Sequence, residues 1–432
     1  MTGALLVAAA LGAGFGRVDL GAPTGHSLAG YFSDRPCEGA LDPVEANCVA
    51  LSYGGRSALV YSLDLVEVKG LCDRWRREIA AATGVTPEAV YIACTHTHTA
   101  PSVGRAADSY EISVEGPVAY DEAVLNKLVD AGRAALADVA PATLRLGSTE
   151  AEGLSFVRRY RMKDGTVRTN PGYSRRDQVE CPAGEADSSV GIVRLDRVGR
   201  PSIALVNFQC HPDMIGGRKV SADWPGFMRR ALERDLGVKA VLFNGAQGDT
   251  NHIDVRNPHS GYDASRKFGE TLAAAVRGAW NDCEVAEPGP ITAEVRLVKV
   301  PIRVPTAEEL VATNGLGKVA LNRLAKLRNA PRELKIPVSR VSIGNSLTFC
   351  GLPCEPFTAI GLAAKRLSPA KATFFTCLTN GSFGYLPADD AYDAGAYETD
   401  SAIFAPGTAS VLVRTLFEMT SAVVLLAYGG MF

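Results

Sequence analysis

Two histidines separated by one residue are the strongest chemical signal in the sequence. His96 and His98 lie in the segment THTHTAP, directly after the apolar run VYIAC, which predicts a buried strand. On a strand, side chains two positions apart point to the same face, so the two imidazoles can address one point in space. Imidazole is the commonest protein ligand for zinc. The pair is therefore more typical of a metal site than of two ordinary core residues.

Other residues able to bind a metal follow strand-like runs elsewhere in the chain. His211 follows VNFQC, Glu355 follows LTFCGLPC, and Tyr385 closes the run that begins ATFFTC. A further apolar run, VLFN, leads into a Gly-rich turn that carries Asp249. In open α/β sheets, ligands bind at the carboxyl ends of strands, so we expect such side chains to converge. Histidine nitrogens with carboxylate oxygens are typical zinc ligands, which makes Zn²⁺ the expected cofactor.

Other catalytic signatures fit the sequence less well. Ala100 stands where an HxHxD metallo-β-lactamase pattern needs Asp, and the regular βα units of a TIM-barrel amidohydrolase are not visible. G-x-S-x-G is absent, and GAQGDTNH lacks the GK[ST] ending of a P-loop. Cys94 and Cys354 adjoin better candidates, so we do not expect a cysteine nucleophile. Structural or solvent-facing roles are expected for the three remaining histidines, His26, His252 and His259.

The composition excludes several classes of protein. The chain of 432 residues has 45 Lys and Arg against 47 Asp and Glu, and this net charge of −2 gives no electrostatic footprint for nucleic acid. With 47% hydrophobic residues, the chain has enough apolar surface to fold. It contains no uncharged apolar run of about 18 residues, the length of a membrane span. We expect a small-molecule substrate as the partner, and a homo-oligomer is compatible with the sequence.

The N-terminus and the cysteines favour a cytoplasmic location over a secreted or periplasmic one. The first basic residue is Arg17, so the apolar start lacks the positive region of a secretory signal. We interpret residues 4–20 as a strand that enters the fold, with a degenerate signal as the alternative. The ten cysteines show no paired spacing, and several lie in apolar runs, which is typical of buried thiols in a reducing compartment.

Short apolar runs alternate with helical patterns along the chain. The expected strands are 57–66, 90–94, 202–210 and 239–244, with β segments at 286–304 and 336–352. The expected helices are 71–84, 121–138, 225–236, 263–280 and 407–428. This order predicts an α/β fold with a mixed, partly parallel sheet flanked by helices, in one domain over residues 1–432. We expect the polar segment 161–188 to be an active-site loop and the basic segment 306–334 to be a helical insertion.

The motifs, taken in order, resemble those of the neutral/alkaline, non-lysosomal ceramidases and their shorter bacterial relatives. GFGRVDL with GYFSDRP is similar to the opening of that family's catalytic N-terminal domain, and THTHTAP is similar to its THTHSGP. NGAQGDTN resembles its NAGDVSPN, GLPCEPFT resembles its PGEFT, and VNFQCHPD holds the downstream histidine. GYLPADDAYDAGAYE resembles its GYVTT…YEG stretch. The resemblance spans nearly the whole chain and implies the ceramidase catalytic-domain fold without the C-terminal immunoglobulin-like domain of the full ceramidases.

The resemblance also implies the metal ligands. In that family zinc is held by the first His of the HTH motif, the later His, the Glu of PGEFT and the first Tyr of the GY…YE stretch. By motif position, these residues are His96, His211, Glu355 and Tyr385. The second histidine of the motif faces the scissile group in the family and is not a ligand. The resemblance therefore assigns His96 to the metal and His98 to the substrate.

Three catalytic side chains follow from the same resemblance. Besides His98, they are Tyr397, the second tyrosine of the stretch, and Arg158, which contacts the substrate carbonyl and has Arg159 as its competitor. The implied enzyme is a zinc-dependent amidohydrolase that cleaves linear or cyclic amides with metal-activated water. Arg158 and Tyr397 would stabilise the oxyanion, and His98 would carry a proton to the departing amine.

The substrate and the reaction are less closely defined. THTHSGP has become THTHTAP and GDVSPN has become GDTNHI, so we expect a substrate smaller or more polar than ceramide. One alternative keeps the metal and changes the chemistry to that of a lyase or a glycoside-cleaving enzyme. Another alternative is a protein without activity in which the site is vestigial or structural.

Overall fold

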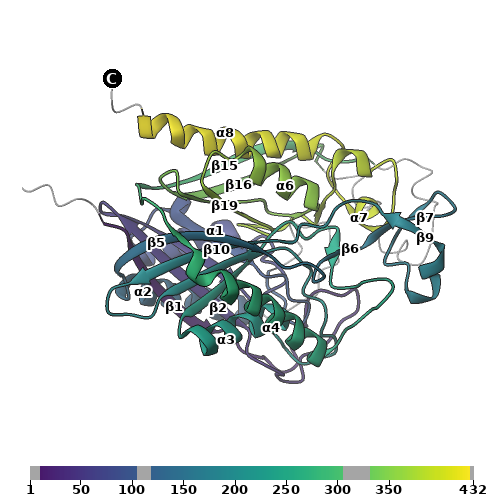
Figure 1. The fold of residues 1–432 in the computed structure, drawn as a ribbon, viewed down its shortest axis with the longest axis horizontal. Helices are drawn as coiled ribbons and strands as arrows, with labels where there is room; N and C mark the ends of the chain where they lie inside the picture. Colours follow the sequence, from purple (N-terminus) through teal and green to yellow (C-terminus); the bar gives the residue numbers. More distant parts are fainter. Residues whose placement is uncertain (1–9, 105–117, 305–330, 429–432) are drawn as a thin grey trace, which may run out of the picture.

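The computed structural model describes residues 10–104, 118–304 and 331–428 (Figure 1). Within these ranges each expected helix and strand segment is found close to its expected bounds. The expected N-terminal strand corresponds to β1 (Gly12–Asp19). Most of the expected helical insertion 306–334 lies outside the described residues, and its last two positions already belong to a strand.

A nine-stranded sheet forms the centre of the protein. Its strands are, in spatial order, β12 (Lys239–Asn244), β11 (Ile203–Phe208), β10 (Ser189–Arg197), β5 (Ala140–Glu150), β1, β2 (Glu45–Tyr53), β3 (Arg56–Leu63) and β4 (Val90–Cys94), with β14 (Glu284–Val285) paired to β5. The end pairs β11–β12 and β3–β4 are parallel, and the other pairs are antiparallel. The prediction of a mixed, partly parallel sheet is confirmed.

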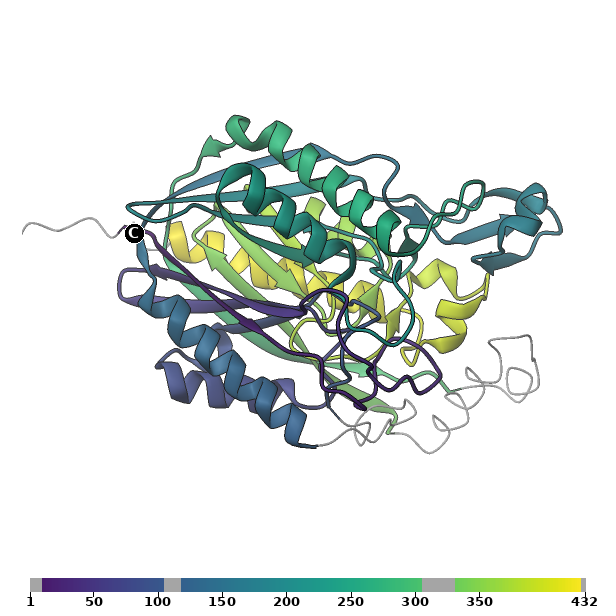
Figure 2. The same cartoon turned by 90° about the horizontal axis from the view of Figure 1, so that it is seen from below.

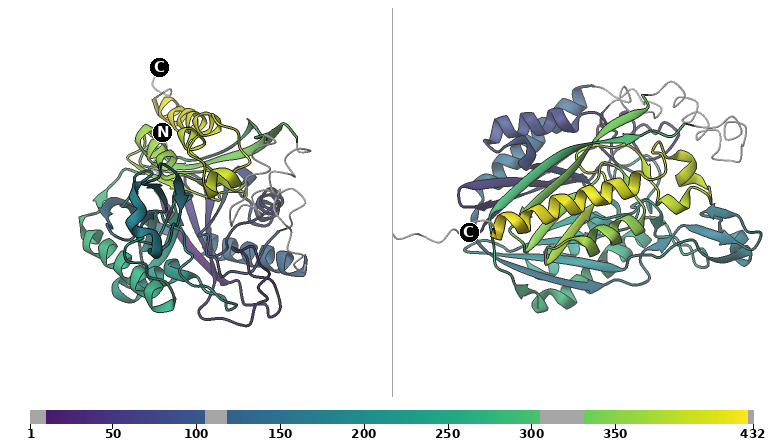
Figure 3. Two further views of the ribbon diagram at one scale, coloured as in Figure 1. Left: turned by 90° about the vertical axis from the view of Figure 1, so that its right-hand side faces the viewer. Right: turned by 90° about the horizontal axis from the view of Figure 1, so that it is seen from above.

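A second sheet and six helices complete four layers, helix–sheet–sheet–helix (Figures 1 and 3). The second sheet has the strand order β15 (Ile291–Pro301), β16 (Glu333–Ile343), β17 (Leu347–Gly351) and β19 (Ala372–Thr376). Its outer face is covered by α6 (Thr358–Leu367) and α8 (Thr408–Tyr428). The outer face of the large sheet is covered by α1 (Cys72–Thr83), α2 (Val118–Ala137), α3 (Asp223–Leu236) and α4 (Tyr262–Ala279).

The large sheet is buried on both faces, which explains its nearly continuous apolar sequence runs. In β2, Val49 points toward the second sheet, whereas the neighbouring Cys48 points toward the helices. Between the two sheets, the ring of Phe349 packs against Phe243 at 5.3 Å and against Phe374 at 5.4 Å. Each such fully buried side chain stabilises the fold by about 1.5–3 kcal/mol.

The large sheet curves so that its two ends approach each other. β4 and β12 stand at opposite ends of the strand order, yet Asn244 of β12 donates from Nδ2 to the main-chain oxygen of Thr95, just after β4, at 2.9 Å. The hydroxyl of Ser62 in β3 likewise donates to the main-chain oxygen of Leu242 in β12. The carboxyl ends of β4, β11 and β12 therefore meet in one place.

Most of segment 161–188 is regular structure and not an open loop. β8 (Val167–Thr169), β7 (Arg159–Met162) and β9 (Val179–Pro182) form a three-stranded sheet with the 3₁₀ helix Tyr173–Gln178. We call this unit, residues 159–182, the arm; it extends from the body of the molecule (Figure 2). Short pairs join other loops: β6 (Phe156–Val157) with β13 (Thr250–Asn251), and β18 (Glu355–Pro356) with β20 (Tyr385–Leu386). A short helix, α7 (Tyr397–Ser401), follows β20.

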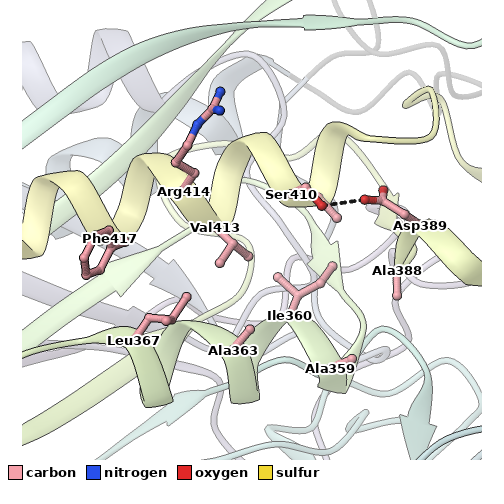
Figure 4. A pocket seen from close by; sticks show the side chains of 11 residues that line it. Ala359, Ile360, Ala363, Leu367, Ala388, Asp389, Ser410, Val413, Arg414 and Phe417 are labelled. Carbon is pink, nitrogen blue, oxygen red and sulfur yellow. Dashed lines mark hydrogen bonds between the residues drawn. The ribbon is translucent and has the colours of Figure 1, made fainter.

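An apolar groove of about 420 Å³ separates α6 from α8 on the outer surface. Ile360, Ala363 and Leu367 of α6 face Val413 and Phe417 of α8 across it (Figure 4). The histidines of the predicted metal site do not line this groove. Among the described residues, no helix has the length and apolar character that crossing a membrane requires.

The ten cysteines are free thiols, nine of them buried. Burial raises the pKa of the Cys94 and Cys354 thiols well above the usual range. Because the thiolate is the nucleophilic form, neither side chain is activated for attack. The expected cytoplasmic location stays a prediction.

Candidate metal and catalytic site

His96 and His98 follow β4 in a loop. The strand ends at Cys94 and His96 has a φ of 73°, so the expectation that strand alternation aligns the two side chains is wrong. The left-handed conformation at His96, uncommon for a residue other than glycine, orients them instead. Nε2 of His98 lies 3.2 Å from Nε2 of His96, and the two rings meet edge to face.

His211 and Glu355 reach the same point from other strands. His211 follows β11, and its Nε2 lies 3.2 Å from Nε2 of His96. Glu355 begins β18, and its Oε2 lies 3.2 Å from Nε2 of His96 and 3.4 Å from Nε2 of His211. The ring nitrogens of His96, His98 and His211 lie within 4.8 Å of one another, so this group could hold a metal ion.

The tautomers of two histidines favour a cation at the centre of the cluster. Nδ1 of His96 lies 2.9 Å from the main-chain oxygen of Val66, and Nδ1 of His211 lies 2.9 Å from that of Gln247. A carbonyl oxygen only accepts hydrogen bonds, so each neutral ring carries its proton on Nδ1 and turns the Nε2 lone pair inward. These lone pairs and Glu355 face one another at close range. A zinc ion would relieve their repulsion, and carbonyl partners of this kind orient histidine ligands in zinc sites.

The electrostatics agree with a cation site. Burial raises the pKa of Glu355, but His96 outweighs this effect and holds it well below the usual range. Burial lowers the pKa of His96, but Glu355 outweighs this effect and leaves it raised. Burial, followed by the charge of His96, lowers the pKa of His98 well below the usual range. Glu355 is therefore a carboxylate and His98 a neutral imidazole near pH 7.

Tyr385, Arg158 and Tyr397 form a second group beside Glu355. Parallel pairing of β18 with β20 places Tyr385 opposite Glu355. Nη2 of Arg158 donates to Oη of Tyr385 at 3.0 Å, and the rings of Tyr385 and Tyr397 lie 5.5 Å apart. Burial raises the pKa of the Tyr385 hydroxyl well above its usual range, and the charge of Arg158 acts in the opposite direction. A phenolate at Tyr385 would therefore need further positive charge, which a metal supplies.

Glu398 was missed by the sequence analysis. It directly follows Tyr397, and its fully buried carboxylate pairs with both arginines: Oε1 lies 2.8 Å from Nε of Arg158, and Oε2 lies 3.2 Å from Nη1 of Arg159. Arg158 contacts Tyr385, whereas the guanidinium of Arg159 lies over the ring of Phe357 at 5.2 Å. The only signal for Glu398 was its place beside Tyr397 in the motif.

Two aromatic residues of an N-terminal loop border the site. Tyr31 packs edge-on against His98 with ring centroids 5.5 Å apart, and Phe32 packs against Tyr397 at 6.2 Å. Arg35 holds this loop, because Nη2 donates to the main-chain oxygen of His98 at 2.6 Å while the guanidinium lies over Tyr31. Tyr31 and Phe32 are 44% and 47% exposed, so their rings are accessible beside two predicted catalytic side chains.

The other three histidines lie outside the cluster. His26 Nε2 lies 2.8 Å from the main-chain oxygen of Ser102, and His259 is exposed. His252 is buried, with Nδ1 3.1 Å from Oδ1 of Asp213. Asp213 is a further residue that the sequence analysis did not identify, and its negative charge acts to raise the pKa of His98.

The four-layer fold and the strand-end cluster define a mixed α/β protein with a candidate metal centre. Its structure is similar to that of the neutral ceramidase from Pseudomonas aeruginosa, with a TM-score of 0.76 over 96% of this chain and 74% of that one, at 19% identity. A ceramidase structure described as complexed with C2 gives a TM-score of 0.75 at 18% identity, over 97% of this chain and 75% of that one. No family model and no curated protein matches the sequence. The neutral ceramidase catalytic fold expected from the resemblance is confirmed.

Proposed function

We propose that the protein is a zinc-dependent hydrolase that cleaves an amide C–N bond. The observation that carries this proposal is the buried convergence of His96, His98 and His211 on the carboxylate of Glu355. The fold supports the reaction class, because two solved structures similar to it are named as ceramidases. His96, His211, Glu355 and Tyr385 would hold the metal, and zinc, when bound, would supply Lewis-acid activation of water at neutral pH.

The protein's own side chains would perform the proton transfers and stabilise charge. His98 is neutral near pH 7, so it can accept a proton from the attacking water and return it to the departing amine. The guanidinium of Arg158 and the hydroxyl of Tyr397 would donate hydrogen bonds to the carbonyl oxygen as negative charge develops. Tyr31 and Phe32 would contact the apolar part of the substrate at the mouth of the site.

The substrate that we propose is an amide smaller or more polar than ceramide. The metal-site motifs match the ceramidase pattern, whereas the neighbouring residues in THTHTAP and GDTNHI differ from it. N-acyl amino acids and lactams are therefore the first candidates, with ceramides as the comparison.

The test begins with metal analysis of the purified protein. We expect about one zinc per chain, loss of zinc and activity on chelation, and recovery of both on adding zinc. Hydrolysis of N-acyl amino acids, lactams and ceramides is then followed in heavy-oxygen water. Incorporation of label into the product acid supports hydrolysis, and an unlabelled product would indicate a lyase on the same scaffold. A protein that neither retains zinc nor gains activity with it would contradict the proposal.

A further inference from the structure

We propose that Glu398 is a positioning residue that holds the guanidinium of Arg158 against Tyr385 and connects it to the arm. This inference rests on the proposed function, in which Arg158 stabilises the developing oxyanion. Glu398 itself does not reach the histidine cluster through any contact of the described residues; it acts through Arg158.

The carboxylate of Glu398 is fully buried and uses both oxygens. Oε1 pairs with Nε of Arg158 at 2.8 Å, and Oε2 pairs with Nη1 of Arg159 at 3.2 Å. The hydroxyl of Thr169 donates to Oε2 at 2.6 Å. A buried carboxylate is tolerated only when it is paired and hydrogen-bonded in this way. The same contacts fix where both guanidinium groups lie.

The backbone that presents Glu398 is under strain. Ala396 precedes α7 with a φ of 83°, a conformation that residues other than glycine rarely adopt. Such strain persists when the surrounding structure over-determines it, and it gathers at functional sites. The main-chain oxygen of Ala396 accepts hydrogen bonds from the main-chain nitrogen of Asp400 at 2.9 Å and the hydroxyl of Thr399 at 2.8 Å, and the ion pairs of Glu398 add to these contacts.

Glu398 is one of three groups that hold the guanidinium of Arg158. Nε of Arg158 forms an ion pair with Oε1 of Glu398 at 2.8 Å. Nη2 donates hydrogen bonds to the main-chain oxygen of Gly248 at 2.7 Å and to Oη of Tyr385 at 3.0 Å. Among the described residues these contacts involve Nε and Nη2, so Nη1 would be the nitrogen that donates toward a substrate carbonyl. Without the Nε contact, a flexible side chain of this length can rotate away from Tyr385.

The charges favour the same role. Arg158, Arg159 and Glu398 together carry one net positive charge in a buried region. Removing the carboxylate would leave two uncompensated guanidinium groups side by side, and their repulsion would displace them. With the carboxylate present, the remaining positive charge is held in place before an oxyanion forms, which is the condition for electrostatic stabilisation of a transition state.

Glu398 also joins the arm to the site. Arg159 belongs to β7 and Thr169 to β8, two strands of the arm, and both contact the Glu398 carboxylate. The arm is therefore anchored on the residue that positions Arg158. Segment 161–188, expected to be an active-site loop, has in Thr169 a specific contact through which it influences catalysis.

The first test is Glu398→Gln, which removes the negative charge of the side chain and keeps its size. We expect kcat for amide hydrolysis to fall about 10- to 100-fold while KM changes little. Displacing a catalytic group by about 1 Å lowers the rate by a factor of this order. In an Arg158→Ala background the same substitution should cause almost no further loss. An equal, independent loss in both backgrounds would overturn the inference, because a general structural effect would persist without Arg158.

A matched control is Glu233→Gln. Glu233 accepts hydrogen bonds from Arg17 at 2.7 and 3.1 Å in the contact between α3 and β1. This substitution also removes a carboxylate paired with an arginine, so stability should fall while kcat is kept. An equal fall in kcat for both variants would also count against the inference.

The second test does not depend on activity. Crystal structures of the wild type and Glu398→Gln should show Nη2 of Arg158 leaving hydrogen-bond distance of Oη of Tyr385. An unmoved guanidinium would overturn the inference even if the proposed function holds. Failure of the wild type to cleave amides would overturn the proposed function alone. If Glu398→Gln does not fold, Thr169→Val removes one hydrogen bond from Glu398, and it should lower kcat with KM kept; unchanged kcat would overturn the inference.

Discussion

The side-chain amide of Asn244 lies 2.9 Å from the main-chain oxygen of Thr95, the residue directly before His96. The same nitrogen donates to the main-chain oxygen of Cys210 at 3.1 Å, directly before His211, and Oδ1 accepts from the main-chain nitrogen of Cys210 at 3.2 Å. One buried side chain therefore holds two histidine-bearing loops that lie far apart in the sequence.

Asn244→Ala should weaken zinc binding about 10- to 100-fold, the usual cost of removing a group that orients metal ligands. It should also lower the free energy of unfolding by about 1–3 kcal/mol through unpaired buried groups. The measurements are zinc titration against a chelating indicator and denaturant unfolding of the metal-free protein.

Asn207→Ala is the control for this substitution. Asn207 is equally buried and donates to two main-chain oxygens, those of Phe243 and Phe375; within the described part of the chain, its side-chain hydrogen bonds do not reach the histidine loops. Its stability loss should be similar, whereas zinc affinity should be unchanged. Equal loss of zinc affinity in both variants would show that Asn244 acts through general destabilisation.

His96 and His98 should differ in what their loss removes. His96→Ala should abolish both zinc binding and hydrolysis, because Nε2 of His96 lies 3.2 Å from both Oε2 of Glu355 and Nε2 of His211. His98→Ala should retain zinc and lower kcat by about 10²- to 10⁴-fold, the range for loss of a general acid–base group. The readouts are zinc content per chain and kcat. Equal zinc loss would instead make His98 a ligand, which its 3.2 Å distance from Nε2 of His96 permits.

The fold class and the placement of candidate ligands after strands could be predicted from the sequence, because both depend on local signals. Apolar runs and helical periodicity identified the strands and helices, and His96, His211 and Glu355 each follow such a run. Features that depend on long-range geometry could not be predicted from the sequence. A strand pattern does not reveal the positive φ of His96, which orients its ring, and no local feature of Glu398 indicates that two arginines, 239 and 240 positions away, share its carboxylate.

Asp223 should make stability fall as pH rises through the mildly acidic range. Burial raises its pKa to about 6, although hydrogen bonds from Ser265 and Ile215 act in the opposite direction. The unfolded carboxyl has a pKa of about 3.9, so between about pH 4 and 6 the folded protein holds a proton that the unfolded chain has lost. Stability contributed by this proton is present at pH 4 and lost as pH passes the folded pKa.

The comparison with Asp223→Asn isolates this group, because the amide does not titrate. The unfolding free energy of the wild type, relative to that of the variant, should decline by up to about 3 kcal/mol from pH 4 to pH 7. Urea unfolding of the metal-free proteins at four or five pH values measures it. A difference that stays constant with pH would mean that Asp223 is ionised throughout.

Gly30 tests whether the N-terminal loop determines the position of His98. A Cβ at Gly30 would lie 2.7 Å from Cγ of His98 and 2.8 Å from its Cβ, and the residue has a φ of 97°. Gly25 has a φ of 81° with open space where a Cβ would lie, so alanine there incurs a similar backbone cost of about 1–2 kcal/mol without the collision. Both Gly30→Ala and Gly25→Ala should therefore lose stability and keep zinc. Only Gly30→Ala should lower kcat, by about 10²-fold, because it would displace the imidazole of His98, which we propose to be catalytic. If kcat is the same in both variants, contact with this loop does not position His98.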